Sequence, residues 1–256
     1  NTTASNNTAV GFRAGYSNTT GSVTAFGQRA SFSNTTGADN VAVGIQALYS
    51  NSTGNFNTAI GHTALNANTT GNVNTAVGYR ALLTNTTGYE NTAIGPNSLK
   101  VNTTGLYNTA VGSTSLFSNT TGNNNTGVGY RSLYQNTTGA QNTGLGQDSF
   151  YSNTTGNYNV GIGFMCLYNN TTANDNTAVG YQAGYANTTG TANSFYGKQS
   201  GYNTSTGNYN AASGNSSLYS NTTGSYNTAF GVNSLFSNTT ATYNTHIGYQ
   251  AGFSNT

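Results

Sequence analysis

The chain has 256 residues, of which only 4% are charged, and its formal net charge is +2. The six bases form no cluster, which argues against nucleic-acid binding, because counterion release requires grouped Lys or Arg. No stretch approaches the roughly twenty apolar residues of a membrane helix, whereas 12% aromatic residues with regular Val, Ile and Thr favour an ordered chain.

A sequence repeat of seventeen residues recurs along the whole chain; one copy is NTAVGYRALLTNTTGYE, at residues 74–90. When its first Asn is position 1, position 5 is Gly in every copy from Gly11 to Gly248, and a single deletion near Ser22 shortens one interval. Short β-rich segments between Gly and Asn at a fixed period indicate stacked repeats. The sequence predicts an all-β fold, a parallel β-solenoid (β-roll) of about fifteen 17-residue coils. These form one domain over residues 1–256, which reads as a window of a longer repeat protein.

Position 4, in the segment NTAVG, is the main apolar position of each coil. We predict that it points into the interior, where it meets the Leu that usually occupies position 9, such as Leu82. Two bulky apolar residues per seventeen are too few for an amphipathic helix but can fill a narrow tube. The position-4 residues are Val10, Phe26, Val43, Ile60, Val77, Ile94, Val111, Val128, Leu145, Ile162, Val179, Tyr196, Phe230 and Ile247, with Ser213 as the exception.

Most charged residues occupy two positions of the coil. Arg13, Arg29, Arg80, Arg131 and Asp148 share position 7, and Asp39, Glu90 and Asp175 share position 17. We predict that both rows face solvent. Equivalent residues of stacked coils lie about 4.8 Å apart, so a row of like charges would repel itself, whereas rows of Asn or Thr can form hydrogen-bonded ladders. Fifteen such coils would extend about 70 Å.

Position 10 carries an aromatic residue in most coils. Because neighbouring residues of an extended chain point to opposite faces, an inward position 9 predicts an outward position 10. A bare stripe of this length exceeds the apolar surface that monomers tolerate, so lateral packing between copies is the first interpretation. A bend that returns the rings to the core and a sugar-stacking platform are the alternatives. This possible self-association row is Tyr16, Phe32, Tyr49, Phe117, Tyr134, Tyr151, Tyr168, Tyr185, Tyr202, Tyr219, Phe236 and Phe253.

The NTT element that follows matches the acceptor pattern for N-glycosylation. Glycans on this row would solubilise a chain with hardly any charge. The same letters are also turn chemistry, with Asn capping the bend and Gly at position 15 closing it. The possible glycosylation sites are Asn18, Asn34, Asn51, Asn68, Asn85, Asn102, Asn119, Asn136, Asn153, Asn170, Asn187, Asn221 and Asn238, with a one-residue shift to Asn203.

The sequence shows no combination of residues that is typical of an enzyme active site. His62 and His246 occupy positions 6 and 3 of distant coils, and no carboxylate pair, metal-ligand cluster or activated nucleophile is apparent. Cys166 has no partner cysteine and reads as a small packed side chain. We therefore expect no enzyme activity, no cofactor and no metal.

Phrases such as DNTAVGYQAGY, at residues 175–185, resemble the head repeats of trimeric autotransporter adhesins of the YadA-like family, and Asn-Thr-rich repeats of bacterial surface and phage-fibre proteins. The resemblance covers nearly all of the chain but rests on a short motif. It implies a left-handed β-roll displayed outside the cell, with three chains side by side. The coil of that family is shorter, about fourteen residues, so the SNTTG segment is an addition here.

These observations predict an extracellular structural or adhesive fibre that self-associates, as a homotrimer or as a filament, for surface display, adhesion or matrix formation. Host-surface, matrix or glycan ligands are further possible partners. A glycosylated filament with one glycan per coil is one alternative. An ice-binding solenoid is another, although Thr69 and Thr70 are adjacent rather than alternating.

Overall fold

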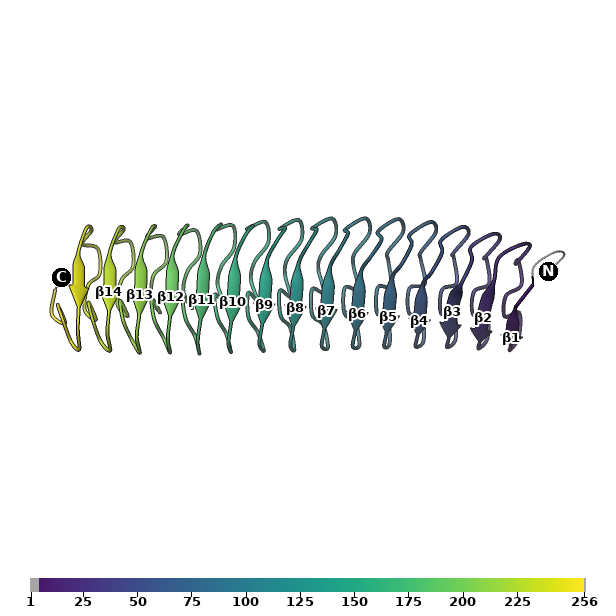
Figure 1. The fold of residues 1–256 in the computed structure, drawn as a ribbon, viewed down its shortest axis with the longest axis horizontal. Coiled ribbons are helices and arrows are strands. Elements are labelled where there is room, and N and C mark those ends of the chain that lie inside the picture. Colours follow the sequence, from purple (N-terminus) through teal and green to yellow (C-terminus); the bar gives the residue numbers. More distant parts are fainter. Residues whose placement is uncertain (1–4, 256) are drawn as a thin grey trace. The chain divides into compact units, whose positions relative to one another are not determined.

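The computed structural model describes residues 5–255 of the chain. Contacts divide the chain into two compact units, residues 1–125 (unit 1) and residues 126–256 (unit 2), and each is described by itself. Both units are all-β, and the described residues contain no helix. The predicted fold is confirmed, because each unit is a parallel β-solenoid in which coils stack in chain order (Figure 1).

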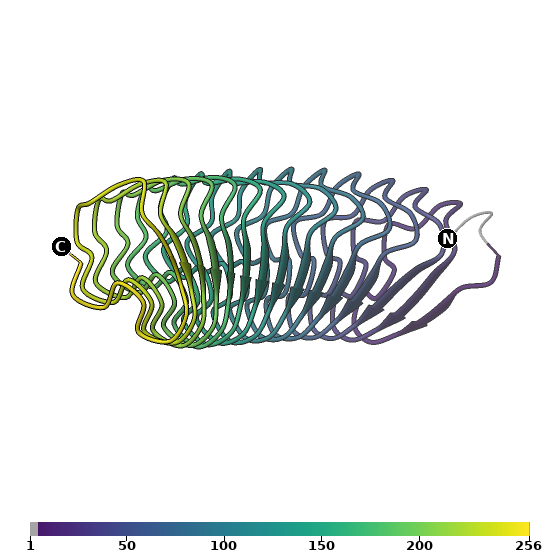
Figure 2. The same cartoon turned by 60° about the vertical axis from the view of Figure 1, so that its left-hand side comes forward.

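Each coil contributes one short strand, formed by positions 2 to 4 and in two coils also by position 1. The strands of unit 1 are β1 (Thr8–Val10), β2 (Val23–Phe26), β3 (Asn40–Val43), β4 (Thr58–Ile60), β5 (Thr75–Val77), β6 (Thr92–Ile94) and β7 (Thr109–Val111). Those of unit 2 are β8 (Thr126–Val128), β9 (Thr143–Leu145), β10 (Val160–Ile162), β11 (Thr177–Val179), β12 (Ser194–Tyr196), β13 (Ala211–Ser213), β14 (Thr228–Phe230) and β15 (Thr245–Ile247). Figure 2 shows the strand on one wall of each loop-shaped coil and irregular backbone around the rest.

The interior of most coils is narrow and is filled by small residues, one Leu and two Asn. In a typical coil Ala76, Ala81 and Leu82, at positions 3, 8 and 9, have no exposed surface. The prediction that position 4 fills the interior is wrong. Val77 lies opposite Ile94 in the adjacent strand, as expected, but successive strand residues alternate, so the inward Ala at position 3 turns position 4 outward. Ile94 is accordingly 41% exposed.

Two ladders of Asn side chains are buried in the interior, and the ladder at position 1 explains why each strand turns its Ala at position 3 inward. At position 12, Asn85 Nδ2 donates to Asn68 Oδ1 of the preceding coil (2.9 Å) and to the Gly88 carbonyl (2.9 Å). At position 1, Asn91 Nδ2 donates to the Gly105 carbonyl (2.8 Å) and to Asn74 Oδ1 (3.2 Å). A buried amide must be paired, and with position 1 inside, strand alternation also places position 3 inside and position 4 outside.

The two glycine rows have different physical causes. At position 5, Gly78 has a φ of +133°, and a Cβ there would lie 2.7 Å from backbone atoms of Gly95 in the next coil. At position 15, a Cβ on Gly88 would overlap both Asn85 Oδ1 of its own coil and the Gly105 carbonyl. The first row therefore requires both the conformation and the space of Gly, and the second requires the space.

Positions 7, 9 and 17 adopt left-handed backbone conformations with non-Gly residues in most coils. Leu82 at position 9 has a φ of +49°, and Val73 at position 17 has a φ of +58°. Such conformations are costly for branched residues and are tolerated only where the surroundings enforce them. This explains why Gly replaces Leu at position 9 in four coils, at Gly15, Gly184, Gly201 and Gly252, all with φ near +60°.

Candidate interaction surfaces

One wall of the coil carries nearly all of the exposed apolar surface. We define the strand face as the columns of residues at positions 17, 2, 4 and 6, which flank or alternate with the buried positions 1 and 3. Among the described residues, every exposed large hydrophobic side chain except Tyr16 and Phe253 lies at position 4, 6 or 17. Position 4 supplies Val10, Phe26, Val43, Ile60, Ile94, Val128, Ile162, Tyr196, Phe230 and Ile247; position 6 supplies Phe12, Ile45, Tyr79, Tyr130, Tyr181, Val232 and Tyr249; position 17 supplies Phe56, Val73, Tyr107, Tyr158, Tyr209, Tyr226 and Tyr243.

The sequence pattern did not predict the strand face, because the residue type at two of its positions, 6 and 17, varies from coil to coil. Position 6 mixes aromatic and aliphatic residues with His, Gln, Pro, Ser, Lys and Asn, and position 17 mixes aromatic residues with charged, polar and small apolar ones. The signal that identifies it is the strict alternation from position 17 to position 6, once the Asn at position 1 is known to be buried. Position 2, mostly Thr, is half-buried between the two aromatic margins.

The aromatic row at position 10 forms ladders on a different wall of the coil. In unit 2, eight rings from Tyr134 to Phe253 stack on one another, with centroids 5.0–5.3 Å apart and interplanar angles of 3–13°. In unit 1, Tyr16, Phe32 and Tyr49 stack in the same way. Most of these rings are half-buried, so they form neither a bare outward stripe nor part of the fully buried interior. Partial burial also raises the pKa of Tyr168 and Tyr202.

Stacking changes what the position-10 row can bind. A sugar packs on the face of an aromatic ring, but each ring of a ladder has its faces covered by the rings before and after it. Only ring edges remain exposed, so the ladder does not offer a sugar-stacking platform. Stacked pairs contribute about 0.5–1.5 kcal/mol each beyond their burial, so the ladder strengthens the contact between successive coils.

The Asn residues of the NTT elements are interior residues. All of the possible glycosylation sites except Asn203 have 0–2% exposed surface, and their side chains belong to the position-12 ladder. In Asn85, for example, both amide hydrogens have buried acceptors. The folded coil therefore has no space for a glycan there, and the turn interpretation accounts for these residues. Asn203 lies at position 11 and is half-buried, because Thr204 takes position 12 in that coil.

The charges at position 17 follow the prediction, whereas those at position 7 follow it only in part, since Arg13 is exposed but Arg29, Arg80 and Arg131 are half-buried. Asp39, Glu90 and Asp175 at position 17 are exposed. Asp148 at position 7 is instead buried, because Arg131 of the preceding coil covers it with an Nε–Oδ1 distance of 2.7 Å. A second bond runs from Arg131 Nη2 to Asp148 Oδ2 (3.1 Å), and this pairing raises the pKa of Arg131. The guanidinium also lies 4.7 Å from the ring centroid of Tyr130.

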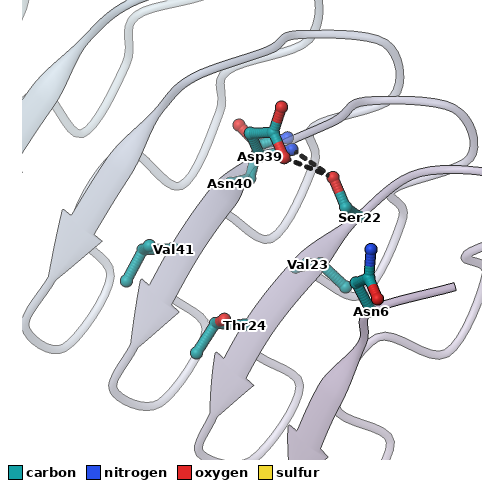
Figure 3. A pocket seen from close by; sticks show the side chains of 7 residues that line it. All are labelled: Asn6, Ser22, Val23, Thr24, Asp39, Asn40 and Val41. Carbon is teal, nitrogen blue, oxygen red and sulfur yellow. Dashed lines mark hydrogen bonds between the residues drawn. The ribbon is translucent and has the colours of Figure 1, made fainter.

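The one cavity of note in the described residues is a shallow depression beside β2 and β3 (Figure 3). Its volume is about 320 Å³, and it lies where the deletion near Ser22 shortens a coil. Asp39 Oδ1 accepts a hydrogen bond from Ser22 Oγ (2.7 Å), and the Asp39 amide donates to the same hydroxyl (2.7 Å). Asp39 is its only charged lining residue, so the depression has no second group for acid–base chemistry.

The two histidines lie in different surroundings, one on the strand face and one at the usual Ala position of the interior. His62 stacks on Tyr79 at 5.7 Å between centroids, and His246 packs over Gly252. In the part of the chain that the structure describes, no three His, Cys, Asp or Glu side chains gather as a metal site. The same residues include no helix long and apolar enough to cross a membrane.

Cys166 occupies position 8, where other coils have Ala or Ser, and its Sγ lies 3.0 Å from the Ala178 carbonyl. Burial raises the pKa of its thiol to about 12, because the thiolate would lose its hydration. We expect no reaction with a disulfide-exchange thiol reagent at pH 8 in the folded chain, and complete reaction in denaturant. The thiol stays protonated well above the pH at which an unfolded Cys ionises, so labelling of the folded chain at pH 9 would contradict this burial.

The fold and surfaces define a class of protein, namely a tandem-repeat parallel β-solenoid with an apolar strand face. Comparison with models of known protein families gives no match, and comparison with curated proteins gives none either.

Proposed function

We propose that the chain is a structural or adhesive fibre protein of the extracellular space that works by self-association. The observation that carries this proposal is the strand face, with its three columns of exposed Val, Ile, Phe and Tyr side chains. Soluble monomers rarely expose contiguous apolar patches beyond a few hundred Å². A surface that repeats at every coil is matched best by a partner with the same repeat, which is a second copy of this chain.

The composition and the short-motif resemblance to adhesin head repeats support the extracellular location in this proposal. A chain with 4% charged residues is poorly suited to remain dispersed alone, and assembly removes its apolar face from water. Association about a closed symmetry axis gives short particles of fixed size, whereas open association gives fibres. Electron micrographs of the purified chain distinguish the two, and antibody labelling of intact source cells tests the location.

The ice-binding alternative receives no specific support from the geometry. The Thr69 hydroxyl at position 13 donates to the Thr86 carbonyl (3.1 Å), so it belongs to the inter-coil bonding. The exposed Thr row of this segment is the single one at position 14, represented by Thr70. A thermal-hysteresis assay tests the remaining prediction directly.

The test of self-association places charges on the strand face. We expect Ile60→Lys/Ile94→Lys to weaken self-association at least tenfold in sedimentation velocity, because burying an unpaired ammonium in an apolar interface is costly. The matched control, Thr70→Lys/Thr104→Lys, adds the same charges to the same two coils at exposed position 14. Circular dichroism confirms that both variants keep the fold. An unmodified chain that stays monomeric up to high micromolar concentration would refute the proposal, as would equal effects of the two variants.

A further inference from the structure

In unit 1, acidic and basic residues lie at opposite edges of the strand face. The acids are at position 17, and the bases are at position 7, directly after position 6. Arg29 and Arg80, at position 7, follow β2 and β5, whereas Asp39 and Glu90, at position 17, precede β3 and β6. The Arg80 guanidinium lies 4.9 Å from the ring centroid of Tyr79, a strand-face residue that is 44% exposed. Asp39 and Glu90 are exposed. None of these four side chains forms an ion pair within the described residues, where the one salt bridge joins Arg131 to Asp148.

These charges lie too far apart to pair within one chain. Position 17 and the position 7 that follows the same strand are separated by seven residues, which is about 20 Å of extended chain. A second copy that faces the first can bring the two margins together. Its orientation decides whether unlike or like charges meet.

Two arrangements cover one strand face with another. Rotation about an axis parallel to the stacking direction of the coils places position 17 of one copy against positions 6 and 7 of the other. Rotation about an axis along the strands places position 17 against position 17, and position 7 against position 7. The second arrangement gathers acids with acids and bases with bases, which like-charge repulsion disfavours.

The spacing of the charges agrees with the first arrangement at both places. Arg80 follows β5 and Glu90 precedes the next strand, β6; Arg29 follows β2 and Asp39 precedes β3. In each case the base and the acid are offset by one coil, about 4.8 Å, which the long Arg side chain spans. If each coil of one copy faces the same coil of the other, both the Arg80–Glu90 pair and the Arg29–Asp39 pair can therefore form. The seven strands of unit 1 offer a face of about 650 Å² on each copy, near the roughly 800 Å² per partner of a standard interface.

We propose that two copies of the chain pack strand face to strand face with their coil-stacking directions parallel, so that Arg80 and Arg29 of one copy meet Glu90 and Asp39 of the other. This inference rests on the proposed self-association and specifies its geometry. The exposed Val and Ile columns form the centre of the interface, and the four charges form its rim.

Two complementary charge reversals in the full-length chain test this geometry. Arg80→Glu alone and Glu90→Arg alone each place like charges at two symmetry-related contacts, so each is expected to weaken self-association about tenfold. An equimolar mixture of the two variants restores unlike pairs only between different chains. We therefore expect the mixture to associate more tightly than either variant alone, with mixed dimers visible by native mass spectrometry. The control is Lys100→Glu, which changes the charge equally at position 10 in the same unit.

The outcomes separate this geometry from the underlying function. If the mixture associates no better than its components while Ile60→Lys/Ile94→Lys still dissociates the protein, the strand face mediates association but the parallel pairing is wrong. Three chains per particle would also overturn the pairing. A monomeric unmodified chain would remove both proposals. The double variant Arg80→Glu/Glu90→Arg in one chain should recover the affinity of the unmodified protein, which distinguishes a charge effect from misfolding.

Discussion

Replacement of Phe195 by Ala is expected to lower the free energy of unfolding by about 3–5 kcal/mol, the cost of removing a buried aromatic ring. Phe195 stands at position 3, where most coils have Ala, and it has no exposed surface. It fits because Gly takes the place of Leu at position 9 in the preceding coil, at Gly184, and in its own coil, at Gly201. A Cβ on Gly201 would overlap Phe195 Cε1.

Because Gly201 makes room for the Phe195 ring, the prediction can be tested by a double-mutant cycle of these two residues. Gly201→Leu alone introduces a clash and is expected to destabilise the coil, although Leu is the usual residue at this position. In Phe195→Ala/Gly201→Leu the interior returns to the pattern of most coils, so the loss should be smaller than the sum of the single effects. Urea unfolding followed by circular dichroism measures all four chains. Additive effects would show that the two residues do not share one interior space.

A second large effect is expected from Asn85→Ala, about 2–5 kcal/mol of lost stability. The substitution leaves Asn68 Oδ1 without its donor and removes one of the two amide donors to the Gly88 carbonyl, the other being Asn74 Nδ2. It also removes one of the two acceptors of Asn102 Nδ2 (2.8 Å). Unpaired buried polar groups cost about 1–3 kcal/mol each. The matched control is Thr87→Ala, two residues away at exposed position 14, which should change stability by less than about 0.5 kcal/mol.

The chain contains a natural interruption of the same ladder, which allows a test in the opposite direction. Thr204 replaces Asn at position 12, and Asn187 Oδ1 in the preceding coil is buried without a hydrogen-bond partner. The Asn221 amide reaches Thr204 Oγ1 only at 3.5 Å. Thr204→Asn should therefore raise stability by about 1 kcal/mol, the net contribution of a restored buried hydrogen bond. A loss of stability in this variant, or no effect of Asn85→Ala, would contradict the role assigned to the ladder.

Compensation between positions 3 and 9 was not predictable from residue types alone. Phe150 replaces Leu at position 9, and Gly161 replaces Ala at position 3 of the next coil, where a Cβ would overlap the Phe150 ring. In the sequence these appear as unrelated exceptions eleven residues apart. They become one feature only when the path of the coil places position 9 beside position 3 of the next layer.

The sequence by itself determined the period, the all-β class and the parallel register. These follow from the repeat, since identical residues seventeen positions apart must occupy equivalent places if every coil is to stack on the next. It also identified both glycine rows and the aromatic row at position 10. Such features depend on the spacing of residues along the chain, which can be measured in the sequence alone.

Only the tertiary structure decided which side of each strand is the interior. Val77 and Ile94 have the hydrophobicity of core residues, and Asn74 and Asn85 have the polarity of surface residues, yet their places are reversed. A buried amide is stable only when the coils above and below supply its partners, and that condition depends on the stack rather than on the residue. With the amide row at position 1 inside, strand alternation turned the Val and Ile column outward, which created the strand face.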